Sequence, residues 1–183
     1  MAEFQEVLDE SMLHFDAKLD QDVASILKKN HYTISVAESV TGGLLADRLS
    51  SLPGSSDYFL GGIVCYHTLL KLSLCGVTPG MVKAHGVVSS EVALEMARGA
   101  QKLMKSAITI STTGVAGPAT PAYPDPLVGT VFVGFSFPNG ETVKQFKLSG
   151  EREVIRFQTT QVALEYLRQY LTSVTNEAGE LFK

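Results

Sequence analysis

The residues with the clearest chemical potential surround Ser39, where a strand pattern gives way to a helix pattern. The apolar run over residues 32–38 predicts a strand, and the amphipathic pattern from Thr41 to about Ser51 predicts a helix. A small-residue turn between two such elements exposes a hydroxyl and points backbone N–H groups and the positive end of the helix dipole at one place. Ser39 is therefore a candidate nucleophile whose oxyanion those N–H groups would stabilise, with a helix N-cap as its alternative role.

A serine nucleophile requires a base, because its hydroxyl reacts weakly at neutral pH. Of the four histidines, His67 follows the second predicted strand and is the one most easily placed near Ser39. Lys71, one helical turn further on, is the other candidate, since partial burial lowers the pKa of a lysine and lets it act as a base. The residues alone leave this choice open.

Two further segments have the chemistry to bind an anion. The turn Gly114-Val115-Ala116-Gly117-Pro118 follows a predicted strand, and its glycines would let the backbone approach a ligand. Arg152 and Arg156 lie one turn apart on the last predicted helix and therefore share a face, from which either would bind a phosphate. The alternatives are a simple glycine turn and a solvated arginine pair.

Composition places the 183-residue chain among ordinary globular proteins, with 45% hydrophobic and 19% charged residues. This length suits one domain. The net charge of −4 is spread along the chain, which argues against nucleic-acid and membrane partners. No signal-peptide pattern or long apolar run is present, so we expect a cytoplasmic protein.

The two cysteines, Cys65 and Cys75, lie in apolar segments ten residues apart. Metal-binding pairs are usually two to four residues apart, with further ligands elsewhere. We therefore expect buried free thiols, no metal and no cofactor.

The order of elements predicts a three-layer α/β/α sandwich around a mixed, mostly parallel sheet of about five strands. Pro79-Gly80 is interpreted as a turn, and Pro138-Asn139-Gly140 as a hairpin turn. We divide the chain into an N-terminal arm or docking helix (1–15), the main domain (16–174) and a C-terminal tail (175–183). Strands are predicted at about 32–38, 59–66, 107–112, 128–137 and 141–148, and helices at about 19–30, 41–51, 70–74, 89–103 and 151–171.

Short motifs follow one another in a fixed order along the chain: Ala37-Glu38-Ser39, Thr41-Gly42-Gly43, Pro53-Gly54-Ser55-Ser56, Phe59-Leu60-Gly61-Gly62, Tyr66 with Lys71 five residues later, Leu74-Cys75-Gly76-Val77, His85-Gly86-Val87-Val88-Ser89, Gly114-Val115-Ala116-Gly117-Pro118, Val128-Gly129-Thr130-Val131 and Gly150-Glu151-Arg152. Across about residues 20–172, this set resembles the CinA C-terminal domain family, the nicotinamide-nucleotide amidases, whose longer members include competence- or damage-inducible proteins.

The resemblance implies hydrolysis of the carboxamide of nicotinamide mononucleotide to nicotinic acid mononucleotide and ammonia, a step of pyridine nucleotide salvage. It implies that Ser39 is the nucleophile and Lys71 its base, with Tyr66 as a further catalytic residue. We expect a small-molecule nucleotide substrate and a homo-oligomer. The substrate-binding residues that it implies are Glu38, Thr41, Gly42, Gly43, Thr113, Gly114, Gly117, Arg152 and Arg156.

The chain departs from the family pattern at three places. His67-Thr68-Leu69-Leu70 stands where the family usually has Ser-Asn-Glu-Ala, so a polar segment has become apolar before Lys71. Residues 119–126 are proline-rich, whereas the family commonly continues in glycines there. Val40 stands directly after the serine, where the family often has Cys or a similar small residue. The competing hypothesis is therefore a nucleotide-binding module that is inactive or has altered specificity.

Overall fold

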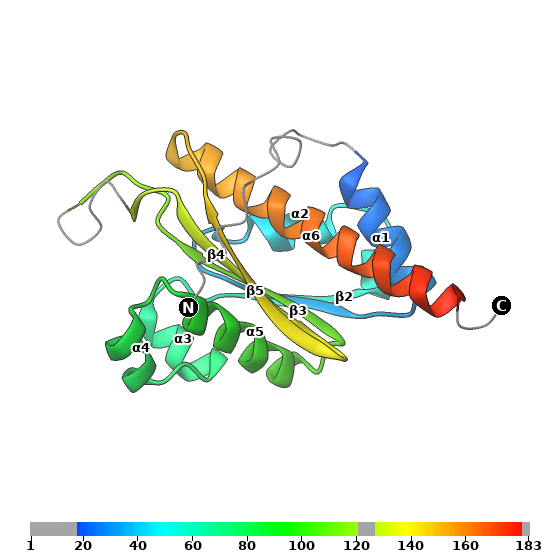
Figure 1. Cartoon of the computed structure of the whole chain (residues 1–183), viewed down its shortest axis with the longest axis horizontal. Helices are drawn as coiled ribbons and strands as arrows, with labels where there is room; N and C mark the ends of the chain where they lie inside the picture. Colours follow the sequence, from blue (N-terminus) through cyan, green and yellow to red (C-terminus); the bar gives the residue numbers. More distant parts are fainter. Residues whose placement is uncertain (1–17, 121–126, 181–183) are drawn as a thin grey trace.

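A computed structural model describes residues 18–120 and 127–180 and shows a five-stranded sheet between two layers of helices (Figure 1). The arm predicted over residues 1–15 lies outside the described residues. The strands are β1 (Ile34–Glu38), β2 (Phe59–Val64), β3 (Ile108–Gly114), β4 (Thr130–Phe137) and β5 (Gly140–Lys147), in the order β2-β1-β3-β4-β5. The predicted mixed α/β/α sandwich is thus confirmed.

The direction of the strands brings the ends of three of them to one edge of the sheet. Strand β1 pairs in parallel with β2 on one side and β3 on the other, whereas β4 is antiparallel to both β3 and β5. The residues that follow β1, β2 and β3 therefore emerge at the same end, where ligands usually bind in such sheets. Ser39 is held there by its N–H, which donates to the Thr112 carbonyl of β3 at 2.9 Å.

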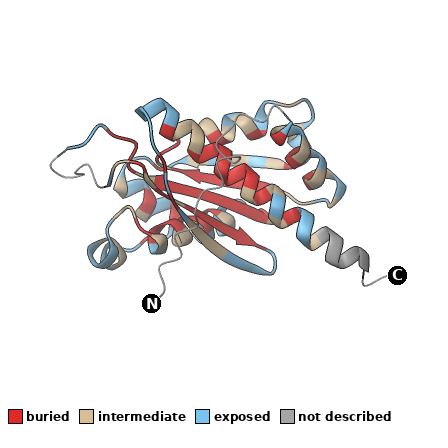
Figure 2. Cartoon of the chain, turned by 45° about the horizontal axis from the view of Figure 1, so that its top comes forward, coloured by how far each residue is buried: buried red, intermediate tan, exposed pale blue. Residues whose placement is uncertain are grey.

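The helices cover both faces of the sheet. On one face lie α1 (Leu19–Lys29), α2 (Leu44–Ser50) and α6 (Arg152–Glu180), and on the other lie α3 (Thr68–Cys75), α4 (Pro79–His85) and α5 (Ser90–Met104) (Figure 1). The strands between them are largely buried (Figure 2). A larger apolar core packs beneath α1 and α6, and a smaller one that includes Cys65, Cys75 and Met96 packs beneath α3 and α5.

The main differences from the sequence-based expectations concern three helices. Helix α2 begins at Leu44 rather than Thr41, because Gly42 and Gly43 have left-handed backbone conformations, with φ of 61° and 102°. Residues 79–85 form helix α4 instead of a simple turn, since Pro79 is well suited to a first helical turn and Thr78 caps it. Helix α6 continues beyond Leu171 to Glu180, through a segment without proline.

The close packing of α5 on α3 depends on Gly99 of α5. Its Cα faces Cys75, the last residue of α3, which is also the helix that contains Lys71. A Cβ added to Gly99 would lie 2.0 Å from the Cys75 carbonyl oxygen and 2.7 Å from the Cys75 Cα. Both are backbone atoms, so the clash would be relieved only by moving one helix away from the other.

We predict that Gly99→Ala destabilises the protein by about 1–3 kcal/mol through overpacking, although alanine normally favours a helix over glycine. Gly80→Ala in α4 is the matched control, because its added Cβ would meet only the Thr78 hydroxyl at 3.8 Å. Urea unfolding of both variants measures the difference. A Gly99→Ala variant as stable as Gly80→Ala would contradict this packing argument.

Candidate active site

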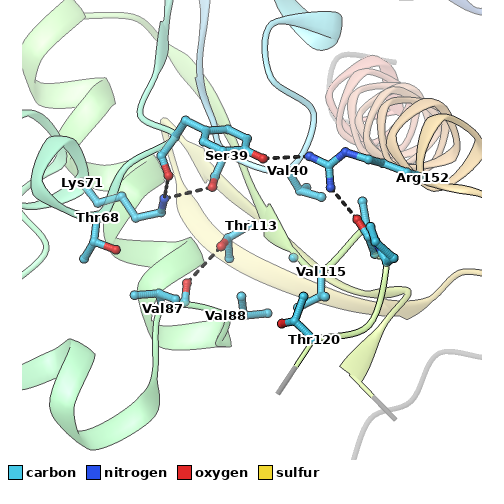
Figure 3. Close-up of a pocket in the computed structure, with 15 residues that line it drawn as sticks. Ser39, Val40, Thr68, Lys71, Val87, Val88, Thr113, Val115, Thr120 and Arg152 are labelled. Carbon is cyan, nitrogen blue, oxygen red and sulfur yellow. Dashed lines mark hydrogen bonds between the residues drawn. The ribbon is translucent and has the colours of Figure 1, made fainter. Parts of the chain in front are cut away.

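Ser39 and Lys71 meet at the carboxyl ends of the parallel strands. Ser39 directly follows β1, and Lys71 lies in the first turns of α3, which starts four residues after β2 ends. The Lys71 Nζ lies 2.9 Å from the Ser39 Oγ, within the expected hydrogen-bonding distance (Figure 3). The structure therefore brings together the two residues that the sequence proposed as nucleophile and base.

The Lys71 amine is buried, with only 3% of the residue exposed. Besides Ser39, it contacts two backbone carbonyl oxygens, those of Cys65 at 2.7 Å and Tyr66 at 3.2 Å. A neutral amine has two N–H groups and one lone pair. The two carbonyls can therefore accept its hydrogens while its lone pair faces the Ser39 hydroxyl, which is the arrangement that a general base requires.

Burial also shifts the pKa of this amine. Loss of hydration lowers the pKa of Lys71 below its ordinary value of 10.5, and the neighbouring Cys65 and Cys75 thiols oppose that shift more weakly. No carboxylate forms a salt bridge with Lys71 within the described parts of the chain. Burial thus makes the neutral form, in which lysine is a base, more accessible than it is for an exposed lysine.

His67, the alternative base, has a structural role in the described site. Its Nδ1 accepts a hydrogen bond from the Leu69 N–H at 3.3 Å, so His67 caps the N-terminus of α3. The side chain is exposed and does not line the pocket around Ser39. By fixing where α3 begins, His67 helps to determine where Lys71 lies.

A pocket of about 300 Å³ opens beside the Ser39–Lys71 pair. This volume is at the lower end of the range for small-molecule sites. Tyr66, which is exposed, lines this pocket together with Thr113, Gly114 and Gly117. The complete lining is Ser39, Val40, Tyr66, Thr68, Lys71, Val87, Val88, Thr113, Gly114, Val115, Ala116, Gly117, Pro118, Thr120 and Arg152.

The structure distinguishes the two candidate arginines. Arg152 lines the pocket, donates to the Tyr66 hydroxyl at 2.7 Å and to the Gly117 carbonyl at 2.6 Å, and so joins its two sides (Figure 3). Arg156 instead donates to the Thr41 carbonyl at 2.9 Å and lies against Gly42, outside the pocket. Only Arg152 is in position to contact a ligand next to Ser39.

Glu38, one of the expected substrate-binding residues, occupies the helix N-terminus that the sequence suggested as an anion site. Its carboxylate is fully buried and accepts hydrogen bonds from the N–H groups of Gly43, Leu45 and Ala46 at 2.8–3.1 Å. The expectation that these N–H groups hold a substrate anion is therefore corrected, because a carboxylate of the protein already satisfies them and the helix dipole.

The turn residues Thr41, Gly42 and Gly43 likewise lie outside the pocket lining. Thr41 is fully buried and its hydroxyl bonds the Thr112 hydroxyl at 2.7 Å, which ties the turn to β3. The two glycines provide the left-handed turn that leads into α2. The structure thus gives these three residues a role in holding Ser39 and does not place them against a ligand.

Several pocket residues were not singled out as site residues from the sequence. Val87 and Val88 come from the segment before α5, and the Val87 carbonyl accepts a hydrogen bond from the Thr113 hydroxyl at 3.0 Å. The motif His85-Gly86-Val87-Val88-Ser89 was a signal for them, but nothing in its residue types indicated contact with Ser39. Residues 121–126, part of the unusual proline-rich segment, lie outside the described residues.

Cys65 and Cys75 are buried, as predicted for free thiols, and both belong to the smaller core beside Lys71. Among residues 18–120 and 127–180, no group of three or more His, Cys, Asp or Glu side chains is arranged to hold a metal ion. In the same residues, no helix is long and apolar enough to cross a membrane.

Comparison with known proteins defines the class to which this fold and site belong. The model of the CinA C-terminal domain matches residues 16–171, and the chain therefore belongs to this family. A CinA-like protein of Geotalea uraniireducens is 44% identical over 85% of this chain and 37% of its own length. One of Thermotoga neapolitana is 40% identical over 85% of this chain and 38% of its own.

Solved structures share the same fold. A competence-damaged protein (CinA) superfamily protein of Klebsiella pneumoniae superposes with a TM-score of 0.81 at 25% identity, covering 85% of this chain and 97% of the other. The competence/damage inducible protein CihA of Agrobacterium tumefaciens gives 0.77 at 30% identity, covering 87% and 98%. The chain thus spans less than half the length of the CinA-like proteins that it matches, but nearly all of these two solved chains.

We predict that Glu38→Gln lowers the free energy of unfolding by about 1.5–3 kcal/mol, because an amide cannot replace the charged acceptor of three backbone N–H groups. Glu151→Gln is the control: this side chain is exposed, and such changes usually stay within about 0.5 kcal/mol. Urea unfolding compares them. Equal stabilities would show that Glu38 does not hold the turn.

Proposed function

We propose that this protein is an amidase that hydrolyses the carboxamide of nicotinamide mononucleotide through Ser39 and Lys71. The observation that supports this most directly is the 2.9 Å contact between the Lys71 Nζ and the Ser39 Oγ, made by a buried amine in an open pocket. Membership of the CinA family supplies the substrate class, through the resemblance described above.

In the acylation step, the neutral Lys71 amine removes the Ser39 hydroxyl proton while the Oγ attacks the carboxamide carbon. The Val40 N–H, which directly follows the nucleophile at the pocket wall, is the donor that we assign to the oxyanion. Lys71 then returns the proton to the departing nitrogen, so that the C–N bond breaks and ammonia leaves. An ester between Ser39 and the nicotinoyl group remains.

Deacylation uses the same two residues. Lys71, neutral again, takes a proton from a water molecule whose oxygen attacks the ester carbon. The proton passes to the Ser39 Oγ as the ester bond breaks, which restores the hydroxyl and releases nicotinic acid mononucleotide. One water is consumed and one ammonia is formed in each cycle, with no change in oxidation state.

The rest of the pocket suits a nucleotide in which an aromatic ring and a phosphate are separated by a sugar. Val87, Val88 and Val115 offer apolar contacts near Ser39, where the pyridine ring must lie for its carboxamide to be attacked. Arg152 provides a cation at the side of Tyr66 and Gly117. We assign the phosphate to Arg152, since its guanidinium makes charge-assisted hydrogen bonds.

The decisive test compares purified wild-type protein with Ser39→Ala. Wild type should release ammonia from nicotinamide mononucleotide, whereas Ser39→Ala should bind it by calorimetry with little loss of affinity and release none, because the hydroxyl acts only in the chemical step. Ser73→Ala, at an exposed position of α3, is the control and should remain active. Wild type that binds the nucleotide but releases no ammonia would instead support a binding module.

The lowered pKa of Lys71 predicts a pH dependence. Because Lys71 acts as a neutral base, kcat/KM should fall about tenfold per pH unit below its pKa, and this limb should lie below the ordinary lysine value of 10.5. Lys71→Met should lose nearly as much activity as Ser39→Ala, since the two residues act as a unit. The measurement is a pH profile of ammonia release. A fall in kcat/KM with its midpoint at pH 10.5 would refute the claim that burial lowers the pKa of Lys71.

Arg152→Ala should mainly weaken substrate binding. Loss of a charge-assisted phosphate contact of about 1.5–3 kcal/mol corresponds to a roughly ten- to hundredfold increase in KM, with a much smaller effect on kcat. Arg98→Ala is the control, because this exposed arginine pairs with Glu141 away from the pocket. An unchanged KM in Arg152→Ala would place the phosphate elsewhere.

A further inference from the structure

Thr68 brings an unpartnered hydroxyl into the pocket beside Ser39. The hydroxyls of Ser39, Tyr66 and Thr113 also line this pocket, and each of them forms a hydrogen bond with another part of the protein. Thr68 is half-buried, and its hydroxyl makes no hydrogen bond within residues 18–120 and 127–180. This oxygen is therefore available to a substrate or to a reacting water.

The position of Thr68 is tied to that of the proposed base. Thr68 is the first residue of α3 and Lys71 lies three residues later, so both side chains emerge on one face of the same short helix. Both residues line the pocket, and Figure 3 shows the Thr68 hydroxyl directed into it. The hydroxyl and the amine thus keep a fixed relation to each other wherever α3 lies.

A purely structural role for this hydroxyl has little support. At the start of a helix, a threonine hydroxyl stabilises the fold mainly as an N-cap, but in α3 the cap is His67. The Thr68 hydroxyl also makes no hydrogen bond to the backbone of α3 in the described chain. Threonine is moreover a weaker helix former than alanine. The hydroxyl is thus better explained by the pocket than by the helix.

The proposed reaction brings two different groups to one position beside the Lys71 amine. In acylation the carboxamide nitrogen must lie there, because Lys71 returns a proton to it as the C–N bond breaks. In deacylation the attacking water must lie there, because the same amine removes its proton. Each group has two hydrogens, and Lys71 takes at most one of them. A neutral oxygen acceptor at this position would therefore orient both groups.

We propose that the Thr68 hydroxyl oxygen is this acceptor, which makes Thr68 a further catalytic residue; the inference rests on the proposed amidase function. In the tetrahedral intermediate, Thr68 accepts one hydrogen of the departing nitrogen, so that the nitrogen lone pair faces the protonated Lys71. After ammonia has left, Thr68 accepts one hydrogen of the incoming water, and Lys71 takes the other. No bond to Thr68 forms or breaks, and its own hydrogen stays in place.

Two substrates that differ only in the leaving group test this proposal. Nicotinamide mononucleotide loses ammonia, whereas the methyl ester of nicotinic acid mononucleotide loses methanol, whose leaving oxygen has no hydrogen that requires an acceptor. With enzyme in excess, a single turnover measures acylation alone. Thr68→Val removes the hydroxyl at nearly constant shape. It should slow ammonia release about two- to tenfold, the range for one neutral hydrogen bond, and leave methanol release unchanged.

The acyl-enzyme formed from the ester tests the second half of the proposal. Its decay, followed by intact-mass spectrometry, should slow by a similar factor in Thr68→Val, because water then occupies the position of the lost nitrogen. Thr68→Ser keeps a hydroxyl and should restore both rates. Ser73→Ala is the control, at an exposed position of the same helix, and should behave as wild type.

The outcomes separate this inference from the function on which it rests. If Thr68→Val merely displaced α3, methanol release would slow as well, because Lys71 must deprotonate Ser39 with either substrate. That result, or unchanged ammonia release in Thr68→Val, would overturn the role of Thr68 and leave the amidase function standing. Wild type that releases no ammonia would overturn the proposed function, and this inference with it.

Discussion

The candidate active site depends on keeping one lysine amine out of water. Burial of a charged amine is costly unless the amine is paired or becomes neutral. Here the hydrogen-bonding partners of the Lys71 amine among the described residues are neutral oxygens: the carbonyls of Cys65 and Tyr66 and the hydroxyl of Ser39. The same desolvation that lowers its pKa therefore suits it to the proposed role of base, and the two carbonyls orient its lone pair toward Ser39.

Two features that never touch the pocket maintain this arrangement. Glu38 holds the start of α2 through three backbone N–H groups, so the turn after Ser39 is fixed by a buried carboxylate. Gly99 lets α5 approach the backbone of α3 at Cys75, one turn beyond Lys71. Ser39 and Lys71 are thus positioned from opposite faces of the sheet, which makes the distance between them sensitive to packing outside the pocket.

The pocket has two parts with different physical character. Ser39 directly follows strand β1, and Lys71 lies on helix α3 just after the adjacent parallel strand β2, so both are tied to the sheet. Arg152 comes from the start of α6 and reaches Tyr66 through an exposed hydrogen bond and Gly117 through a partly buried one. The buried pair suits bond making and breaking, and the exposed arginine suits recognition of a charged group that arrives from solvent.

The sequence by itself determined the layers, the strand order along the chain, the position of Ser39 and the pairing with Lys71, because these depend on local periodicity and on an ordered set of family motifs. It did not reveal that helix α4 begins at Pro79, or that the Glu38 carboxylate accepts the N–H groups expected for a substrate anion. It also left Arg152 and Arg156 equivalent, since they share a helix face one turn apart. Tertiary structure separated them: Gly117 and Tyr66 approach Arg152, whereas Thr41 and Gly42 lie against Arg156. Such long-range contacts depend on how distant segments pack, which no local pattern records.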